Sequence, residues 1–547
     1  MLLIDRTARF IARLLQILRE IVVLSFSASS FVDGRKVHLN GPLRLRLFLE
    51  RVGGAFIKLG QVLALRQDFV PIRYTEELLK LLSNVPEASW TEIEAVFVSA
   101  HGRTPKEYFR DFDTQAIASA SIGQVYRAML EDGTPVAVKI RRPGVMELFE
   151  TDFLLASFLG EIFGILTFTK SLPIHDVVAE FITTSRIELD FRNEAENGSI
   201  LRKHAEGHQG IVLPKIFEEH TTECVLVSEF LDRIVTAEAA LRGIENKKDF
   251  KVLLKRESGI DIDKVVSRFI IDGLRQYLID GFFHADPHPG NIFMLSEDRI
   301  GYFDFGMVGR AGEKRIHVLH IIHAIANKDH LTISSRFLEF AKSIFEEEIA
   351  VYRRSGKKLD EEVEEAIQKI QEIMIDNFAL EVETILAPWY AAVEKMTPLN
   401  TNTTILQRAK SSSNVFMRII AMAQGYGVTM PREVVMFFRS ISIADLVALR
   451  LNPRFDIIQA IHTFFHEYPL LEAERIINER THEKEIESIG TLDTVVPSME
   501  IAAEIKAIEQ ERIHVARERL VELIAGYSEI YPEVRDVFKP KRPVHVT

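Results

Sequence analysis

The chain has almost no cysteine and no long hydrophobic run. Its 547 residues include a single cysteine, Cys224, which excludes an intramolecular disulfide and argues against a cysteine-ligated metal site. No uninterrupted apolar run reaches the ~20 residues that a membrane-spanning helix needs. We therefore predict a cytoplasmic protein without a transmembrane helix, and the cysteine usage suits a reducing compartment.

Positive charge is not in excess either. The formal net charge is -12 and the pI is about 5.9. Nucleic-acid binding needs a basic surface that neutralises phosphates, so we expect no nucleic-acid partner. Hydrophobic residues make up 47% of the chain and charged residues 27%. This composition is typical of globular proteins with ample core, and the length predicts several domain-sized units.

The N-terminus contains a basic amphipathic segment at residues 5–26. Phe10, Leu14, Ile17 with Leu18, and Ile21 recur at helical spacing, with arginines between them. Such a helix can lie on a membrane surface, or it can pack its apolar face on its own domain. We favour packing, and attachment to the inner face of the membrane stays a hypothesis.

The periodicity changes along the chain. Residues 1–105 have helical spacing throughout, whereas the alternation at 124–130 and 135–141 predicts two strands joined by a turn. Continuous helix is expected over 174–203. A further pair of strands is expected over 212–217 and 224–230, and helices dominate after residue 313.

The stretch "FFHADPHPGNIF" (282–293) combines polar groups with apolar flanks. Its prolines and glycine predict a rigid loop that holds Asp286 and Asn291 in a fixed relation. A predicted hairpin over 292–303 then returns the chain to Asp304 of "DFG". Carboxylate and amide oxygens are ligands that Mg²⁺ prefers, so we predict Asn291 and Asp304 as metal ligands. Asp286 would orient or deprotonate the nucleophile.

Phosphoryl transfer also needs a cation on the phosphates. In "VAVKI", Lys139 occupies the strand position that kinases use for this purpose. The segment "RIELDFRNEA" offers Glu188, Asp190 and Glu194 as carboxylate partners for this lysine. We favour Glu194, and the sequence leaves Glu188 open.

With these residues the chain resembles the UbiB/AarF family of atypical kinase-like proteins. The match extends from about Leu45 to Gly309. It rests on "KLGQ" (58–61), the alanine-rich "ASASIGQVYRA" (118–128), "ELD" (188–190), "HADPHPGN" (284–291) and "DFG" (304–306). The resemblance implies an α+β, two-lobed protein-kinase-like fold with a helical N-terminal extension and a large helical C-terminal region. The expected segments are 1–105 (extension), 106–230 (N-lobe), 231–380 (C-lobe) and 381–547 (helical C-terminal region).

The resemblance also implies roles for individual residues. ATP and Mg²⁺ are the expected cofactors, with Asp286, Lys139 and Glu194 as catalytic residues. The nucleotide would lie under the alanine-rich loop and against a hinge. A regulatory lid would cover the position of a protein substrate, so ordinary protein-kinase activity is doubtful. The loop residues are Ala118, Ala120, Ser121 and Gly123, the hinge residues are Glu229 and Phe230, and the lid residues are Lys58, Gln61, Glu188 and Asp190.

The biological role implied by the resemblance is support of ubiquinone or other isoprenoid-lipid biosynthesis. The expected partner is an isoprenoid lipid or quinone precursor, together with a membrane surface or lipid-biosynthesis proteins. Some bacterial members end in transmembrane helices, whereas residues 499–547 here are too charged to span a membrane. Two alternatives stay open: a small-molecule kinase of the aminoglycoside/choline phosphotransferase type, and a nucleotide-gated scaffold without catalysis.

Overall fold

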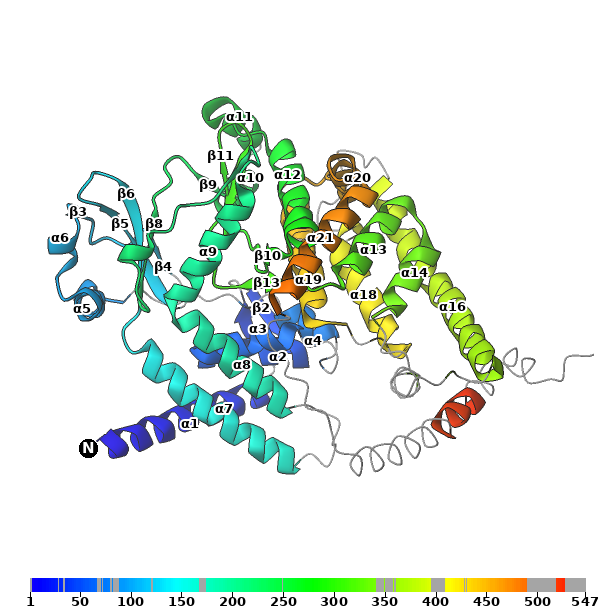
Figure 1. Cartoon of the computed structure of the whole chain (residues 1–547). Coiled ribbons are helices and arrows are strands. Elements are labelled where there is room, and N and C mark those ends of the chain that lie inside the picture. Colours follow the sequence, from blue (N-terminus) through cyan, green and yellow to red (C-terminus); the bar gives the residue numbers. More distant parts are fainter. Residues whose placement is uncertain are drawn as a thin grey trace, which may run out of the picture. The chain divides into compact units, whose positions relative to one another are not determined.

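The computed structural model describes most of the chain as two compact units, Met1–Phe269 with Phe282–Gly309, and Ile270–Gly281 with Arg310–Thr547. Figure 1 shows the elements of each unit. The described residues are all except 1, 28, 33–34, 66–69, 71, 79–80, 82–87, 120–121, 167–173, 248, 341–348, 350–357, 359–360, 395–408, 427, 429, 489–517 and 527–547. The four segments expected from the sequence remain a prediction.

The main sheet of the first unit is antiparallel, in the order β3-β5-β6-β8, with β4 paired to β5. The strands are β3 (Asp111–Phe112), β4 (Ala118–Ser119), β5 (Gly123–Met129), β6 (Pro135–Arg141) and β8 (Val225–Glu229). Alternation along β6 buries Val136, Val138 and Ile140 in a core shared with α5 (Trp90–His101). Lys139 therefore projects from the opposite face of the sheet.

A helix break separates the two glutamates considered as partners of Lys139. One continuous helix over 174–203 was predicted, and this is wrong, because α8 (Ile174–Leu189) ends before α9 (Phe191–Ala205) begins. Asp190 is the N-cap of α9 and accepts a hydrogen bond from the Arg192 backbone N–H. An Asp that caps an N-terminus satisfies amide groups that would otherwise lack a partner. The break places Glu188 at the end of one helix and Glu194 in the first turn of the next.

A second sheet carries the polar loop. Its order is β7-β12-β11-β9, and β11 and β12 form the expected hairpin. These strands are β7 (Ile211–Val212), β9 (Val235–Thr236), β11 (Ile292–Leu295) and β12 (Arg299–Tyr302). The strand expected over 212–217 is wrong in length, because β7 has two residues and pairs in parallel with β12. The expected pairing with 224–230 is formed only locally, where Ile216 bridges antiparallel to Ser228 of β8. β10 (Phe282–His284) and β13 (Val308–Arg310) form a separate pair.

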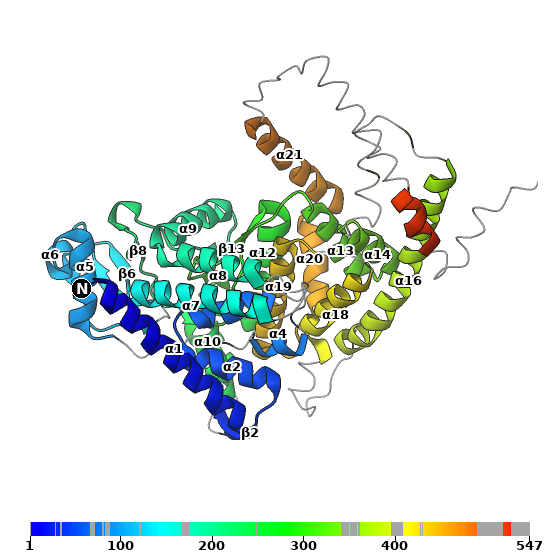
Figure 2. The ribbon, with the colours of Figure 1, turned by 90° about the horizontal axis from the view of Figure 1, so that it is seen from below.

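The N-terminal helices pack with α7 (Val145–Leu166). Figure 2 shows α1 (Leu2–Phe26) beside α7 and α2 (Gly41–Val52). Ile17 is buried in this cluster, with Phe10 and Leu14 packed against it. Leu18 and Ile21 are 46% and 45% exposed, so only part of the apolar face predicted from the sequence packs inside the protein. α3 (Ala55–Leu65) and α4 (Ile72–Leu78) complete the group.

The expectation of helix throughout 1–105 is wrong in one place. β1 (Ser29–Val32) and β2 (Arg35–His38) form an antiparallel pair. The sequence carried a signal for this pair, because Asp-Gly between short β-prone runs favours a hairpin. The remaining elements of the first unit are α6 (Pro105–Tyr108), the 3₁₀ turn η1 (Glu218–His220), α10 (Ala237–Asn246), α11 (Phe250–Ser258) and most of α12 (Ile262–Arg275).

The second unit is helical. After the π-helical turn η2 (Gln276–Asp280), it contains α13 (Arg315–Asn327), α14 (His330–Leu338), α16 (Glu361–Glu394), α18 (Ser412–Gly425), α19 (Arg432–Leu451), α20 (Ile457–Glu467) and α21 (Leu470–Ser488). Its core includes Phe337, Phe378 and Phe438. Over the part of the chain that the structure describes, we find no helix with the length and apolarity needed to cross a bilayer.

Candidate active site

The centre of the site is an ion pair between β6 and α9. Lys139 Nζ donates to both carboxylate oxygens of Glu194, at 2.9 and 2.8 Å, and lies 3.8 Å from Asp304 Oδ2. The ring of Phe191 lies under the ammonium group, with 5.1 Å from Nζ to the ring centroid. Of the two glutamates that the sequence left open, the structure pairs Glu194 with Lys139.

The other glutamate holds the lysine of the "KLGQ" segment. Lys58 Nζ, on α3, lies 2.5 Å from Glu188 Oε2 at the end of α8. Both side chains are largely buried. Lys58 also interacts electrostatically with Asp286 and Asp304, so α3 borders the same site as β6 and α9.

The loop after β10 is held by its own polar groups. Asn291 Nδ2 donates to the Asp286 carbonyl at 3.2 Å. His284 Nδ1 accepts from the Asp286 backbone N–H at 3.2 Å, and His284 Nε2 lies 3.1 Å from the Phe303 carbonyl. Burial lowers the pKa of His284, so its neutral form accepts at Nδ1 and donates at Nε2. This histidine links the Asp286 loop to the segment before Asp304.

Asp304 has an unusual backbone conformation. Its φ is 55°, which L-residues other than Asn and Asp rarely adopt, and its Oδ1 accepts from the Gly306 backbone N–H at 3.2 Å. The following ring, Phe305, is buried against α9, where Asn197 Nδ2 donates to the Phe305 carbonyl at 3.0 Å. Helix α9 therefore positions both Glu194 and the segment that carries Asp304.

The charged groups in this site shift the pKa values of their neighbours. Partial desolvation would raise the pKa of Asp304, but the positive charges of Lys139 and Lys58 outweigh it and lower this pKa to about 2. Burial would lower the pKa of Lys139, but Asp304 and Glu194 raise it instead. Asp304 is therefore a carboxylate and Lys139 an ammonium at neutral pH.

The donor set fits a divalent metal with a nucleotide. Four carboxylates (Glu188, Glu194, Asp286 and Asp304) face two lysines, which leaves two negative charges in excess. The Asp304 side chain is 43% exposed, so a ligand can reach it. Mg²⁺ is usually held by one or two protein groups together with phosphate oxygens, and Asn291 with Asp304 supplies two hard oxygen donors. Among the described residues, no three His, Cys, Asp or Glu side chains form a metal cage.

The alanine-rich loop and the hinge fit a nucleotide less completely. Ala118 lies in β4, and Gly123 is packed so closely that a Cβ there would lie 3.0 Å from the Ile140 carbonyl. Ala120 and Ser121 lie outside the described residues. The backbone N–H groups of Glu229 and Phe230 donate to Lys215 and Pro135. An adenine would therefore have to use other groups of this segment.

The structure brings together only some of the residues expected to form the lid. Lys58 and Glu188 meet, whereas Asp190 caps α9 and pairs with Arg192 at 2.6 Å. Its place in a Lys58 cluster is therefore not supported. The Gln61 side chain lies outside the described residues.

The structure adds a buried contact that the sequence did not reveal. Arg13 of α1 donates to Asp152 of α7 at 2.7 and 3.0 Å, and to the Val52 and Gly53 carbonyls. Asp152 also accepts from the Ala55 backbone N–H at 2.9 Å, at the start of α3. The two residues are 139 positions apart, so no local pattern could have paired them. This contact ties α1 and α7 to the helix that carries Lys58.

Comparisons with known proteins find a matching family model and several similar chains. The family model described as "ABC1 atypical kinase-like domain" matches residues 80–336, which confirms the predicted α+β, kinase-like fold class. An uncharacterised Synechocystis protein is 32% identical over 343 residues, covering 62% of this chain and 80% of the relative. A probable protein kinase UbiB of Xylella fastidiosa is 28% identical over 422 residues, covering 76% of this chain and 67% of the relative. A solved Mycobacterium tuberculosis structure, Rv3197 with erythromycin, aligns with a TM-score of 0.48 at 21% identity, covering 78% of this chain and 95% of that one.

Proposed function

Because the chain belongs to the UbiB/AarF family of atypical kinase-like proteins, we propose that it is a Mg²⁺-dependent ATPase or phosphotransferase. Its role would be to support ubiquinone or other isoprenoid-lipid biosynthesis. The observation that carries the proposal is the contact of Lys139 with Glu194 and Asp304. These groups fit the three tasks of holding phosphates, fixing the lysine and binding the metal.

Each residue has a distinct role in this mechanism. Lys139 binds the nucleotide phosphates, and Glu194 keeps its ammonium in place. Asn291 and Asp304 would hold Mg²⁺, and the bound metal would neutralise charge on the phosphates. Asp286 orients the attacking nucleophile or accepts its proton, and this nucleophile is water or the hydroxyl group of a small molecule. His284 fixes the backbone N–H of Asp286 and so positions the loop.

The acceptor is proposed to be water or a small molecule rather than a protein. Lys58 and Glu188 join α3 to α8 beside the site, in keeping with a lid over the place of a protein substrate. A quinone precursor or an isoprenoid lipid is the acceptor or effector that we propose. Transfer of phosphate to a specific small alcohol would instead favour a kinase of the aminoglycoside/choline phosphotransferase type.

Peripheral membrane attachment is part of the proposal, and α1 supports it with a second apolar face. Ile11, Leu15, Leu18, Val22 and Phe26 follow helical spacing and are 46–87% exposed. The buried face of the same helix contains Ile17, so charges placed on the exposed face leave the core intact. Flotation of Leu15→Glu/Val22→Glu with liposomes tests attachment through this face, and wild-type flotation of this variant would exclude α1 as the attachment site.

ATP hydrolysis by the purified chain with Mg²⁺ tests the central proposal. It is measured with and without liposomes and a phenolic quinone precursor, beside Asp304→Asn and Lys139→Ala. We expect turnover that rises with lipid or phenol and disappears in Asp304→Asn. Tight nucleotide binding without turnover under every condition would refute the enzyme and favour a nucleotide-gated scaffold.

A further inference from the structure

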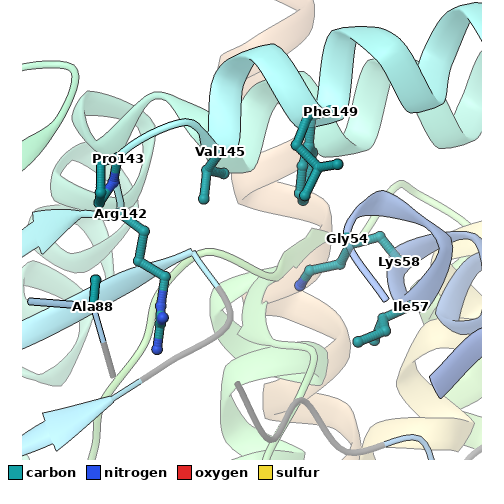
Figure 3. Close-up of a pocket in the computed structure, with 9 residues that line it drawn as sticks. Gly54, Ile57, Lys58, Ala88, Arg142, Pro143, Val145 and Phe149 are labelled. Atoms are coloured by element: carbon teal, nitrogen blue, oxygen red, sulfur yellow. The ribbon is translucent and has the colours of Figure 1, made fainter. Parts of the chain in front are cut away.

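The two lysines of the site are positioned within the first unit. Figure 3 shows Lys58 on α3, at the border of a cavity of about 200 Å³, and its ammonium is paired with Glu188 at 2.5 Å. Lys139 is paired with Glu194 in the same unit. The segment that carries Asp286 differs from both, because the chain enters it from the second unit. Its position therefore depends on how the chain is held where it leaves that unit.

A short π-helical turn precedes the segment that carries Asp286. This turn, η2, continues α12 and ends at Gly281, whose φ of 69° is left-handed. Phe282, the next residue, begins β10 and belongs to the first unit. π-helical turns are frequent at functional sites. Because one residue separates η2 from β10, a contact that fixes the end of η2 also fixes where β10 begins.

The end of η2 is held by an arginine from α21. The last carbonyl groups of a helix lack partners within the helix, and in η2 the Ile279 carbonyl accepts from Arg480 Nη1 at 2.8 Å. The same nitrogen lies 3.5 Å from Asp280 Oδ1. Cations are favoured at the C-terminal ends of helices. One guanidinium nitrogen thus holds both the backbone and a side chain at the end of the turn.

Asp280 is shared between two arginines. Arg275, the last residue of α12, donates through Nη1 to Asp280 Oδ2 and through Nη2 to Asp272 at 2.8 Å. Arg480 approaches the other oxygen of Asp280. The side chains of Asp280 and Arg275 are both 5% exposed, whereas that of Arg480 is 42% exposed. Removal of Arg480 therefore leaves the buried carboxylate paired with Arg275.

The packing of α21 turns Arg480 toward η2. Ala473 and Ile477 are buried, and together with Arg480 they follow the i, i+4, i+7 spacing of one helix face. A second contact attaches α21 to α13, where Glu474 Oε1 lies 2.7 Å from His320 Nε2. The contacts with η2 and with α13 are thus made by different residues and can be disturbed separately.

We propose that Arg480 is a positioning residue for the reaction: it holds the end of η2 and so sets where β10 begins and where Asp286 lies. Arg480 acts through Ile279 and Asp280. The inference rests on the proposed function, in which Asp286 orients or deprotonates the nucleophile. It gives a task in catalysis to α21, which lies outside the residues 80–336 that match the family model.

Arg480→Met tests this role, because methionine keeps the apolar stem and removes every donor. Misplacement of a catalytic group by about 1 Å can reduce a rate by roughly 10²-fold, so we expect kcat for ATP hydrolysis to fall at least about tenfold. KM for ATP should stay at the wild-type value, because Lys139 and the metal ligands are unchanged. Arg480→Lys keeps the charge and a donor and should recover part of kcat. Thermal melts give the folded fraction, to which each kcat is referred.

Two variants on the same helix are matched controls. Arg475→Met removes an arginine that pairs with Glu472 and Glu479 of α21 itself. Glu474→Gln weakens the attachment of α21 to α13 rather than to η2. Both should keep the wild-type kcat. A loss of kcat in Glu474→Gln as large as that in Arg480→Met would show that α21 is a structural support alone, and would overturn the proposal.

Hydrogen exchange of residues 281–286, measured on the full chain without nucleotide, is independent of turnover. We expect faster exchange of this segment in Arg480→Met and wild-type exchange in Arg475→Met. Unchanged exchange in Arg480→Met would overturn the proposal, and so would a wild-type kcat. A wild-type chain that hydrolyses no ATP would instead refute the proposed function, and faster exchange in Arg480→Met would still show that Arg480 holds this segment.

Discussion

Lys139 and Glu194 form a two-oxygen contact, at 2.9 and 2.8 Å, between a central strand and the first turn of α9. The contact depends on the helix break at Asp190, which starts α9 where Glu194 can face the sheet. Glu188, six residues earlier, ends the preceding helix and holds Lys58 instead. One short segment thus supplies both lysines with separate partners, and each lysine can be disturbed without removing the partner of the other.

Glu194→Gln tests whether Glu194 positions the Lys139 ammonium, separately from any effect on folding. Glutamine keeps the shape of the side chain but cannot hold the Lys139 ammonium by charge, so the lysine can move toward Asp304. Misplacement of a catalytic group by about 1 Å can reduce a rate by roughly 10²-fold. We expect a loss of ATP hydrolysis of about that size, measured by steady-state phosphate release.

The matched control is Glu196→Gln, because Glu196 is exposed on the same helix. It should retain wild-type turnover, and thermal melts of both variants show whether either unfolds. Wild-type turnover in Glu194→Gln would remove this glutamate from the mechanism.

The sequence predicted the centre of the site because its chemistry is carried by short motifs. Alternation in "VAVKI" predicted which face of β6 carries Lys139, and the hairpin after the polar loop predicted the return of the chain to Asp304. Both are local features: the alternation has a period of two residues, and the hairpin is recognised from a few neighbouring residues. The structure forms both.

Contacts between distant segments could not be predicted in the same way. Nothing near Arg13 indicates Asp152, and no spacing indicates that Arg480 would meet Ile279. The break at Asp190 was missed because helical periodicity continues on both sides of it, although Asp is a frequent N-cap. The β1–β2 pair was missed because the helical spacing of its neighbours dominated the interpretation.

Gly198→Ala tests the contact between α9 and Phe305. A Cβ at this position would lie 2.7 Å from Phe305 Cδ2 and 3.2 Å from Ile216 Cγ1, so the ring must move. Overpacking of this kind costs about 1–3 kcal/mol, and movement of Phe305 also displaces Asp304. We expect a lower free energy of unfolding in urea and a reduced rate of ATP hydrolysis. Gly526→Ala, where a Cβ meets nothing within 4 Å, should change neither.

Asp445 should make stability depend on pH. It is buried in α19, where its Oδ2 accepts from the backbone N–H and Oγ of Ser412 at 2.7 and 2.8 Å. Burial raises its pKa to about 6, although the Ser412 bonds oppose the shift. A carboxyl whose pKa is higher in the folded state contributes stability below its unfolded pKa of ~3.9, and this is lost as pH rises through about 6.

The contribution of Asp445 to stability is measured at each pH as the unfolding free energy of the wild type minus that of Asp445→Asn. We expect this difference to fall by up to roughly 3 kcal/mol between pH 4 and pH 7. Asparagine does not titrate, so the pH dependence of all other groups cancels in this difference. Asp376→Asn, on the exposed face of α16, is the control. A difference that stays constant from pH 4 to pH 7 would contradict this role of Asp445.

Arg13→Gln tests whether α1 supports the helix that carries Lys58. The substitution leaves the buried Asp152 without its cation, and breaking a buried ion pair in this way costs about 3–5 kcal/mol. Asp152 also holds the Ala55 backbone N–H at the start of α3, so we expect Lys58 to lose its fixed position too. The measurement is hydrogen exchange of the α3 amides, which should become faster in Arg13→Gln. Arg19→Gln, on the exposed side of α1, should leave exchange unchanged. Equal α3 exchange in both variants would mean that α3 holds its position without the Arg13 contact.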